Sequence, residues 1–162
     1  MKAPTTPTLL GRALRWLSVR EYTRAELAQR LSAFEETPGQ MQGVLDTLEK
    51  KGFLSDARAA QSLVHRRQGK LGAARIGHEL RAKGVAPELL RDTVEQLRVT
   101  ERERAQAVWA QKFGAAASDR AGQMRQMRFL ATRGFAADTI RQVVPKPTGL
   151  GTHASPEDAD LE

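Results

Sequence analysis

Hydrophobic residues recur along most of the chain at spacings of three and four positions, the period of an α-helix that buries one face. Leu27 and Leu31 form one such pair, and Ile76 and Leu80 form another. Sustained alternation with β-branched residues, which is typical of strands, does not occur in the sequence. The pattern therefore predicts an all-α protein.

Helix ends carry signals of their own. Ser55 and Ser118 suit N-caps, and Pro87 suits a first helical position. Three possible capping boxes join a threonine to an acid or amide three residues later: Thr23 with Glu26, Thr37 with Gln40, and Thr100 with Glu103. Four helical stretches are followed by a glycine that suits a left-handed stop: Gly52, Gly84, Gly114 and Gly134. These signals divide the chain into short helices.

The hydrophobic pattern also repeats along the chain. A slide of 49 residues places Leu31 on Leu80 and Leu48 on Leu97. A further slide of 50 residues places Leu63 on Phe113, Leu80 on Leu130 and Gly84 on Gly134. We therefore predict three tandem three-helix repeats, at residues 9–53, 55–99 and 101–144. Because each unit can bury only a small core, the repeats should stack into an elongated, curved array. Residues 145–162 are rich in proline, glycine and acids and predict a disordered acidic tail.

The composition narrows the class of protein. The chain has 162 residues and no cysteine, which excludes disulfides, zinc–thiolate sites and thiol catalysis and favours a reducing, cytoplasmic setting. No apolar run is long enough to span a bilayer, and the N-terminus lacks the hydrophobic region of a secretory signal. We therefore expect a cytoplasmic protein without a membrane partner. Because the charges of the three repeats are uneven, we also expect a monomer.

The sequence contains no recognisable catalytic or metal-binding constellation. Its three histidines, His65, His78 and His153, show no ligand spacing. The glycine-rich stretch 69–77 lacks the P-loop pattern GxxxxGK[ST] and a preceding strand, so we interpret it as a tight turn between two helices. We therefore expect no enzymatic activity, no metal and no cofactor.

Positive charge is concentrated in the second and third units. The chain carries 26 basic and 19 acidic residues, but residues 1–56 carry eight and seven. A folded basic surface points to the phosphates of a nucleic acid or to an acidic protein. The basic residues that could line one groove are Arg66, Arg67, Lys70, Arg75, Arg81, Lys83, Arg91, Arg125, Arg128, Arg133 and Arg141. The alternative is that they only solvate helix faces and helix C-termini.

Two other interpretations stay open. Residues 23–54 also suit a helix-turn-helix transcription regulator, in which the helix near residues 40–50 would enter the major groove. That helix has no Arg or Lys at its start, and no wing hairpin follows Phe53. A general basic nucleic-acid-binding protein, with strongly salt-dependent affinity, is the second alternative. Trp16 and Trp109 fall on the first helices of their units, where core packing is favoured over base stacking.

One part of the chain resembles a known family. The run Gly52-Phe53-Leu54-Ser55-Asp56, followed by Arg67, Gly72, Arg75-Ile76, Glu79-Leu80 and Lys83-Gly84-Val85, resembles the RecX family, regulatory proteins of the RecA recombinase. The resemblance extends over about residues 10–145 and is most specific over 52–85.

The resemblance implies a non-enzymatic modulator built of three three-helix units. Such a protein would bind the RecA filament on single-stranded DNA and suppress ATP hydrolysis, strand exchange and co-protease activity. ATP and magnesium would belong to RecA. The basic residues of units two and three would then meet acidic RecA surface or DNA phosphates.

Overall fold

The computed structural model describes residues 7–149, and within this range the chain forms nine α-helices, one short 3-10 helix and no strand. The elements are α1 (Leu9–Leu17), α2 (Arg24–Leu31), η1 (Ser32–Phe34), α3 (Gln40–Lys50), α4 (Asp56–Arg67), α5 (Ala73–Ala82), α6 (Pro87–Val99), α7 (Glu101–Lys112), α8 (Arg120–Thr132) and α9 (Ala137–Val143). The predicted all-α class is confirmed. Among the described residues, no helix is long and apolar enough to cross a membrane.

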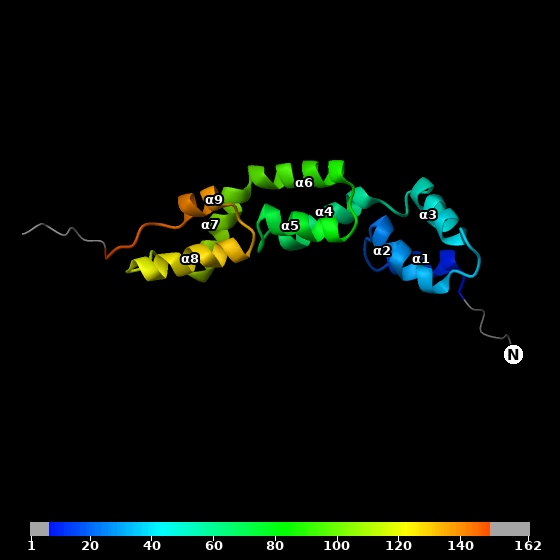
Figure 1. The fold of residues 1–162 in the computed structure, drawn as a ribbon, viewed down its shortest axis with the longest axis horizontal. Helices are drawn as coiled ribbons and strands as arrows, with labels where there is room; N and C mark the ends of the chain where they lie inside the picture. The colour runs from blue at the N-terminus through cyan, green and yellow to red at the C-terminus, as the bar shows by residue number, and fades with distance from the viewer. Residues whose placement is uncertain (1–6, 150–162) are drawn as a thin grey trace, which may run out of the picture.

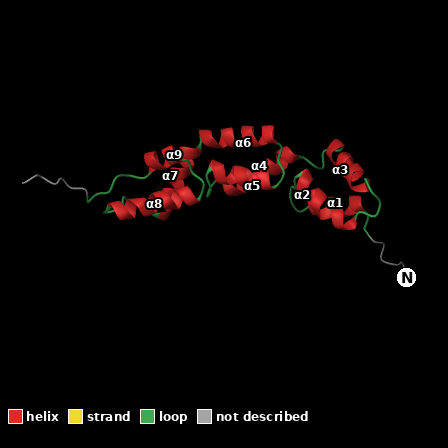
Figure 2. Cartoon of the chain, in the orientation of Figure 1, coloured by secondary structure: helices red, strands yellow, loops and turns green. Residues whose placement is uncertain are grey.

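The helices follow one another in sets of three along the long axis and form an arched array (Figures 1 and 2). We call these sets repeat 1 (α1–α3), repeat 2 (α4–α6) and repeat 3 (α7–α9). Helices α5 and α8 lie along one edge of the array, and α6 and α9 lie along the other (Figure 1). The elongated, curved array of three-helix repeats that the sequence predicts is therefore present.

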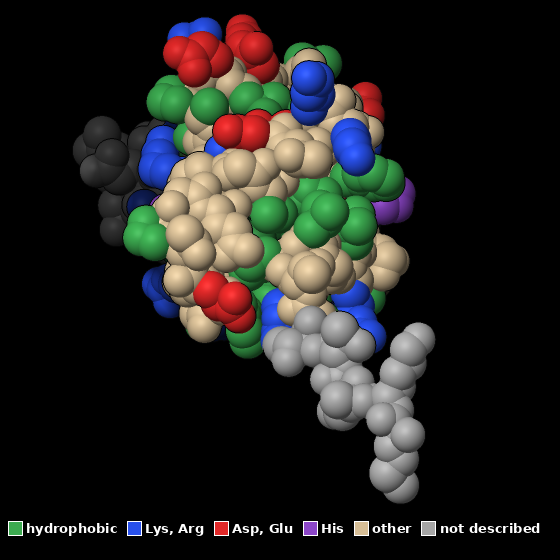
Figure 3. All heavy atoms as spheres, turned by 90° about the vertical axis from the view of Figure 1, so that its right-hand side faces the viewer, with side chains coloured by type: hydrophobic (Ala, Val, Ile, Leu, Met, Phe, Trp, Pro, Cys, Tyr) green, Lys and Arg blue, Asp and Glu red, His purple; other side chains and the backbone are tan. Residues whose placement is uncertain are grey.

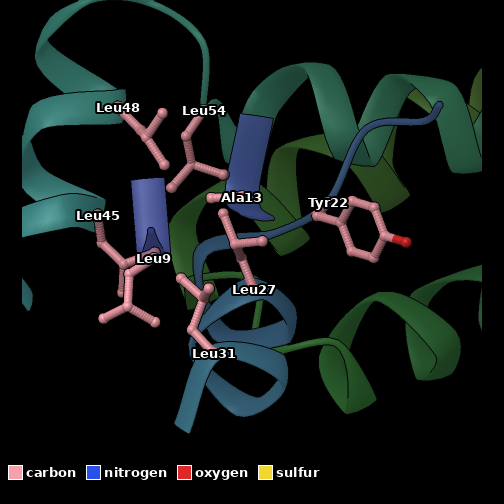
Figure 4. Close-up of a cluster of buried hydrophobic side chains, with 8 residues drawn as sticks. All are labelled: Leu9, Ala13, Tyr22, Leu27, Leu31, Leu45, Leu48 and Leu54. Atoms are coloured by element: carbon pink, nitrogen blue, oxygen red, sulfur yellow. The ribbon is translucent and has the colours of Figure 1, made fainter. Parts of the chain in front are cut away.

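Each repeat encloses its own hydrophobic cluster. Leu31, Leu80 and Leu130 occupy the same place near the C-terminal ends of α2, α5 and α8, and all three are fully buried. Burial of one such side chain contributes about 1.5–3 kcal/mol, so these positions anchor the three cores. Figure 4 shows the cluster of repeat 1, in which leucines from several helices converge. Trp109 is buried and Trp16 packs against the repeat 1 cluster, which confirms their predicted core role.

The predicted register of the first helices is wrong. The N-caps of α1, α4 and α7 are Thr8, Ser55 and Thr100, so these helices are offset by 47 and 45 residues rather than 49 and 50. Leu63 is therefore equivalent to Val108 and not to Phe113. The change from 45 to 50 residues has two parts: the connection 113–119 is two residues longer than the connection 68–72, and α8 has three more residues before Leu130 than α5 has before Leu80. A single slide cannot align helices on both sides of a loop that changes length.

Several of the predicted helix ends are confirmed. Thr23 and Glu26 form a reciprocal capping box, and Ser55 Oγ accepts a hydrogen bond from the Arg58 amide. Pro87 is the first residue of α6. The four predicted stop glycines all have positive φ angles, between 69° and 82°. At these positions the backbone conformation favours glycine because a Cβ atom would be strained.

Three predicted caps are wrong. Helix α3 begins at Gln40 after the left-handed Gly39, so the predicted box on Thr37 does not form. Thr100 makes no side-chain cap, because it alone connects α6 to α7 and lacks the extended backbone of a normal N-cap. At α8 the cap is Asp119 rather than Ser118, and its carboxylate accepts from the Gly122 amide.

Both junctions between repeats use the same hydrogen bond. The Asp56 carboxylate at the start of α4 accepts from the Arg24 amide at the start of α2, with a distance of 2.7 Å. The Glu101 carboxylate at the start of α7 accepts from the Ala73 amide at the start of α5, with a distance of 2.8 Å. An acid that opens one repeat thus caps the second helix of the repeat before it. An anion is favoured at a helix N-terminus, so each junction is stabilised electrostatically.

The first residues of the predicted tail pack on repeat 3. Thr148 and Gly149 donate backbone hydrogen bonds to the carbonyls of Ala117 and Ser118, and Pro147 is buried. The rest of the predicted acidic tail, residues 150–162, lies outside the described residues.

Candidate binding site at the junction of repeats 2 and 3

Two glycines allow repeats 2 and 3 to approach closely. The Gly72 amide donates to the Arg133 carbonyl across the junction, at 2.8 Å. A Cβ atom on Gly72 would lie 2.2 Å from the Gly134 carbonyl oxygen, and one on Gly134 would lie 2.5 Å from Cβ of Arg75. Larger residues at either position would therefore push the two repeats apart.

Glu101 is a buried carboxylate at the centre of this junction. It accepts from the Ala73 amide at 2.8 Å, and from the Ala136 amide and the Thr139 hydroxyl at 3.3 Å each. Its donors therefore come from the N-termini of α5 and α9, two helices in different repeats. Because both helix ends carry partial positive charge, the carboxylate holds them together.

Arg104, one turn after Glu101 on α7, also joins the two repeats, but as a hydrogen-bond donor to backbone carbonyls of repeat 2. Its guanidinium donates to the carbonyls of Gln68, Leu71 and Leu97, at 2.7 to 3.1 Å. Burial lowers the pKa of Arg104 from its ordinary value, and the nearby Glu101 carboxylate opposes that shift. The side chain is thus committed to the fold and is not available to a partner.

This framework leaves two hollows that share the turn 68–72 and the C-terminal end of α8. The first has a volume of about 530 Å³ and is lined by Arg67, Leu71, Arg75, His78, Glu79, Ala82 and Thr132. The second has a volume of about 380 Å³ and is lined by Gly69, Lys70, Val108, Gln111, Lys112, Phe129 and Arg133. Of the predicted basic residues, the junction therefore gathers Arg67, Arg75, Lys70 and Arg133 into one region.

The second hollow is the more electropositive of the two. Lys70, Lys112 and Arg133 line it, and its lining contains no acidic residue. The Arg133 guanidinium lies 3.6 Å above the Phe129 ring, which orders it. In the first hollow, by contrast, the Glu79 carboxylate accepts two hydrogen bonds from Arg67, at 3.0 and 3.1 Å. The Glu79 contact raises the pKa of Arg67 and leaves less free positive charge there.

The other predicted basic residues lie elsewhere. Lys83 donates to Glu26 of repeat 1 at 2.6 Å, so it lies at the first junction and not at the hollows of the second. Arg66, Arg81, Arg128 and Arg141 are exposed on their helices, and Arg125 lines a smaller hollow near the start of α8. Arg91 lies on α6 beside Asp92, along the edge of the array opposite α5 and α8 (Figure 1). The structure does not gather these residues into one groove.

Lys112 lines the hollow although it is absent from the predicted set. It is the last residue of α7, as Arg67 is the last residue of α4, and the two are related by the 45-residue offset of the first helices. The 50-residue slide hides this equivalence. A register taken from the N-caps would have found it.

The glycine-rich stretch 69–77 contains the predicted turn between two helices, but the turn is shorter than predicted. Residues 69–72 form the turn after α4, and residues 73–77 are the first part of α5. Within residues 7–149, no three His, Asp or Glu side chains are grouped closely enough to hold a metal ion. The feature that distinguishes this junction is the positive charge of Lys70, Lys112 and Arg133 around the second hollow.

Comparison with known proteins identifies the family. The chain matches the family models of two RecX domains, the second three-helix domain over residues 55–94 and the third over residues 100–144. It is 45% identical over 137 residues to the regulatory protein RecX of Leptothrix cholodnii, which covers 85% of this chain and 87% of that protein. It is 36% identical over 162 residues to regulatory protein RecX of Ralstonia pickettii, which covers 99% of each chain.

The fold is shared with solved structures. The crystal structure of RecX from Lactobacillus salivarius superposes with a TM-score of 0.70 and 22% identity, over 83% of this chain and 91% of that chain. A second crystal structure, of a regulatory protein RecX, superposes with a TM-score of 0.69 and 20% identity, over 83% and 70% of the two chains. The sequence identity over most of the chain, together with the three-helix repeats, shows that this protein belongs to the RecX family of regulatory proteins.

Proposed function

We propose that this protein is a non-enzymatic inhibitor of RecA that binds the RecA filament on single-stranded DNA. In this proposal it suppresses ATP hydrolysis, strand exchange and co-protease activity, and ATP and magnesium are bound by RecA. The names of the relatives, regulatory protein RecX, support a regulatory role. The observation that carries the proposed binding mode is the cluster of Lys70, Lys112 and Arg133 at the junction of repeats 2 and 3.

The position of this cluster supports contact with a long polyanion. Lys70 and Lys112 are exposed and, within residues 7–149, neither forms an ion pair with a carboxylate. A phosphate that binds there would not have to displace an internal partner. The bonds of Glu101 and Arg104 fix the two repeats relative to each other, so the cations are held in place before binding. Such preorganisation lowers the entropic cost of association.

The proposal is tested by the ATPase rate of RecA on single-stranded DNA. The chain is titrated at substoichiometric amounts and at two salt concentrations. We expect inhibition well below one molecule per RecA protomer, because a filament regulator acts on many protomers at once. Unchanged ATPase activity, together with tight binding to free single-stranded DNA, would favour the general nucleic-acid-binding alternative instead.

Two matched variants test the binding site. The double variant K70Q/K112Q removes two charges from the hollow, and R91Q/R98Q removes two exposed charges from α6. We expect K70Q/K112Q to raise the concentration needed for half-maximal inhibition by about tenfold or more, and R91Q/R98Q to change it less than threefold. Equal effects of the two variants would show that overall charge, and not this junction, determines binding.

A further inference from the structure

Repeat 1 carries a continuous stack of arginine and aromatic side chains. The Arg12 guanidinium lies 4.1 Å from the centre of the Phe34 ring, and the Phe34 and Trp16 rings are 6.2 Å apart. Arg30 lies 4.6 Å from the Trp16 ring and 5.4 Å from the Tyr22 ring. The stack thus joins α1, the loop that follows it, α2 and η1.

The stack ends on an arginine at the far side of Tyr22. Arg20 covers the Tyr22 ring at 3.5 Å, and Figure 4 shows that Tyr22 points away from the leucines of the core. The six side chains therefore order one another along one side of the repeat 1 cluster: Tyr22 is buried in it, whereas Arg30 and Phe34 are exposed.

Two of these arginines, Arg12 and Arg30, carry a positive charge that a partner's carboxylate could neutralise. Arg20 pairs with Glu26, but within residues 7–149 no carboxylate lies within ion-pair distance of Arg12 or Arg30. Among the residues that the structure describes, the Arg30 guanidinium donates to the Tyr22 hydroxyl alone. A guanidinium that lies flat on a ring directs its N–H groups sideways, where they can meet a carboxylate in bidentate geometry.

The surroundings of the stack favour a protein partner over a nucleic acid. The rings already have guanidiniums or other rings against them, which leaves little room for a stacked base. Residues 1–56 are nearly neutral, so a polyanion gains little from counterion release here. Glu35 and Glu36 line the hollow beside Arg12, so the surface here is of mixed sign and offers no continuous positive track for a polyanion.

Apolar exposure in repeat 1 supports the same choice. Large hydrophobic side chains are exposed at Leu10, Val19, Phe34 and Phe53. The end of the array that repeat 1 forms shows hydrophobic side chains with both basic and acidic ones around them (Figure 3). Arginine and aromatic side chains, of which Arg30 and Phe34 are exposed here, are residue types that are enriched at protein-binding hot spots.

We propose that the arginine–aromatic stack of repeat 1 is a separate docking surface for a protein that presents carboxylates beside apolar side chains. Resting on the function proposed above, we assign that protein surface to the filament subunits themselves. Repeat 1 then contacts protein, and the junction of repeats 2 and 3 contacts phosphates. In this arrangement two parts of the elongated array bind surfaces of different chemistry, one of protein and one of phosphates.

The experiment compares two kinds of binding by the full chain. One measures binding to a RecA filament assembled on single-stranded DNA, and the other measures binding to the same oligonucleotide without RecA. The test variant is R12Q/R30Q, and the matched control is R15Q/K50Q, which makes the same change of charge at two exposed side chains of repeat 1. A third variant, R12K/R30K, keeps the charge but removes the planar fork. Circular dichroism confirms that each variant is folded.

We expect R12Q/R30Q to weaken filament binding by about tenfold or more, with oligonucleotide binding changed less than twofold. R12K/R30K should recover only part of the loss, and R15Q/K50Q should change filament binding less than threefold. Filament binding that stays normal in R12Q/R30Q, or an equal loss for filament and oligonucleotide, would overturn the inference alone. Failure of the parent chain to bind the filament would overturn the proposed function as well.

Discussion

The sharpest structural prediction concerns Glu101, the buried carboxylate between repeats 2 and 3. In the variant Glu101→Gln one carboxylate oxygen becomes an NH₂ group in a site that contains only donors. Three contacts depend on it, to the Ala73 amide, the Ala136 amide and the Thr139 hydroxyl. The amide group can still accept through its oxygen, but it cannot satisfy all three donors at once.

The expected cost follows from these contacts. A hydrogen bond to a charged group contributes about 1.5–3 kcal/mol, and an anion at a helix N-terminus adds about 0.3–1 kcal/mol. Two of the three contacts are long, at 3.3 Å, so we count the bond to Ala73 fully and the others in part. We therefore expect Glu101→Gln to lower the free energy of unfolding by about 2–4 kcal/mol. This is a large part of the 5–15 kcal/mol that is typical of a whole protein.

The assay is urea unfolding followed by circular dichroism, with Glu103→Gln as the control. Glu103 is exposed on the same helix and makes none of these contacts, so its loss should cost less than about 0.5 kcal/mol. Small-angle scattering should also detect a change in the arrangement of repeats 2 and 3 in Glu101→Gln, while helix content stays near that of the parent. A cost below about 0.5 kcal/mol for Glu101→Gln would refute the reasoning.

Two further predictions concern the other close contacts between repeats. Gly134→Ala should destabilise the protein by at least about 2 kcal/mol in urea unfolding, because φ is 82° and the new methyl group would lie 2.5 Å from Cβ of Arg75. The control Gly43→Ala should not destabilise it, because Gly43 on α3 has open space around it. Burial raises the pKa of Glu26, but hydrogen bonds from Lys83, the Thr23 amide and Arg20 outweigh it, so this pKa lies below its ordinary value of 4.5. The folded state therefore gains stability above pH 4.5 that is lost as the pH falls below it. Glu26→Gln should remove this part of the acid dependence, and an unchanged pH profile of thermal unfolding would contradict the assignment.

Much of the local structure follows from the sequence. Helix periodicity and stop glycines depend on residues within a few positions of one another, so the chain pattern contains the information needed to predict them. The repeat of Leu31, Leu80 and Leu130 is visible for the same reason, because each must fill the core of its own unit. The resemblance over residues 52–85 adds the family, which the comparisons confirm.

The tertiary structure decided which charged groups are free. Lys83 and Arg133 look alike in the sequence, but Lys83 is paired with Glu26 across one junction, while Arg133 lines the hollow at the other. The partner of Lys83 lies 57 residues away, beyond the reach of any local pattern. The capping of Ala73 by Glu101 is likewise a contact between repeats. Amphipathic spacing determines which face of a helix is buried, but only the packing of one repeat on the next determines which cations a partner can reach.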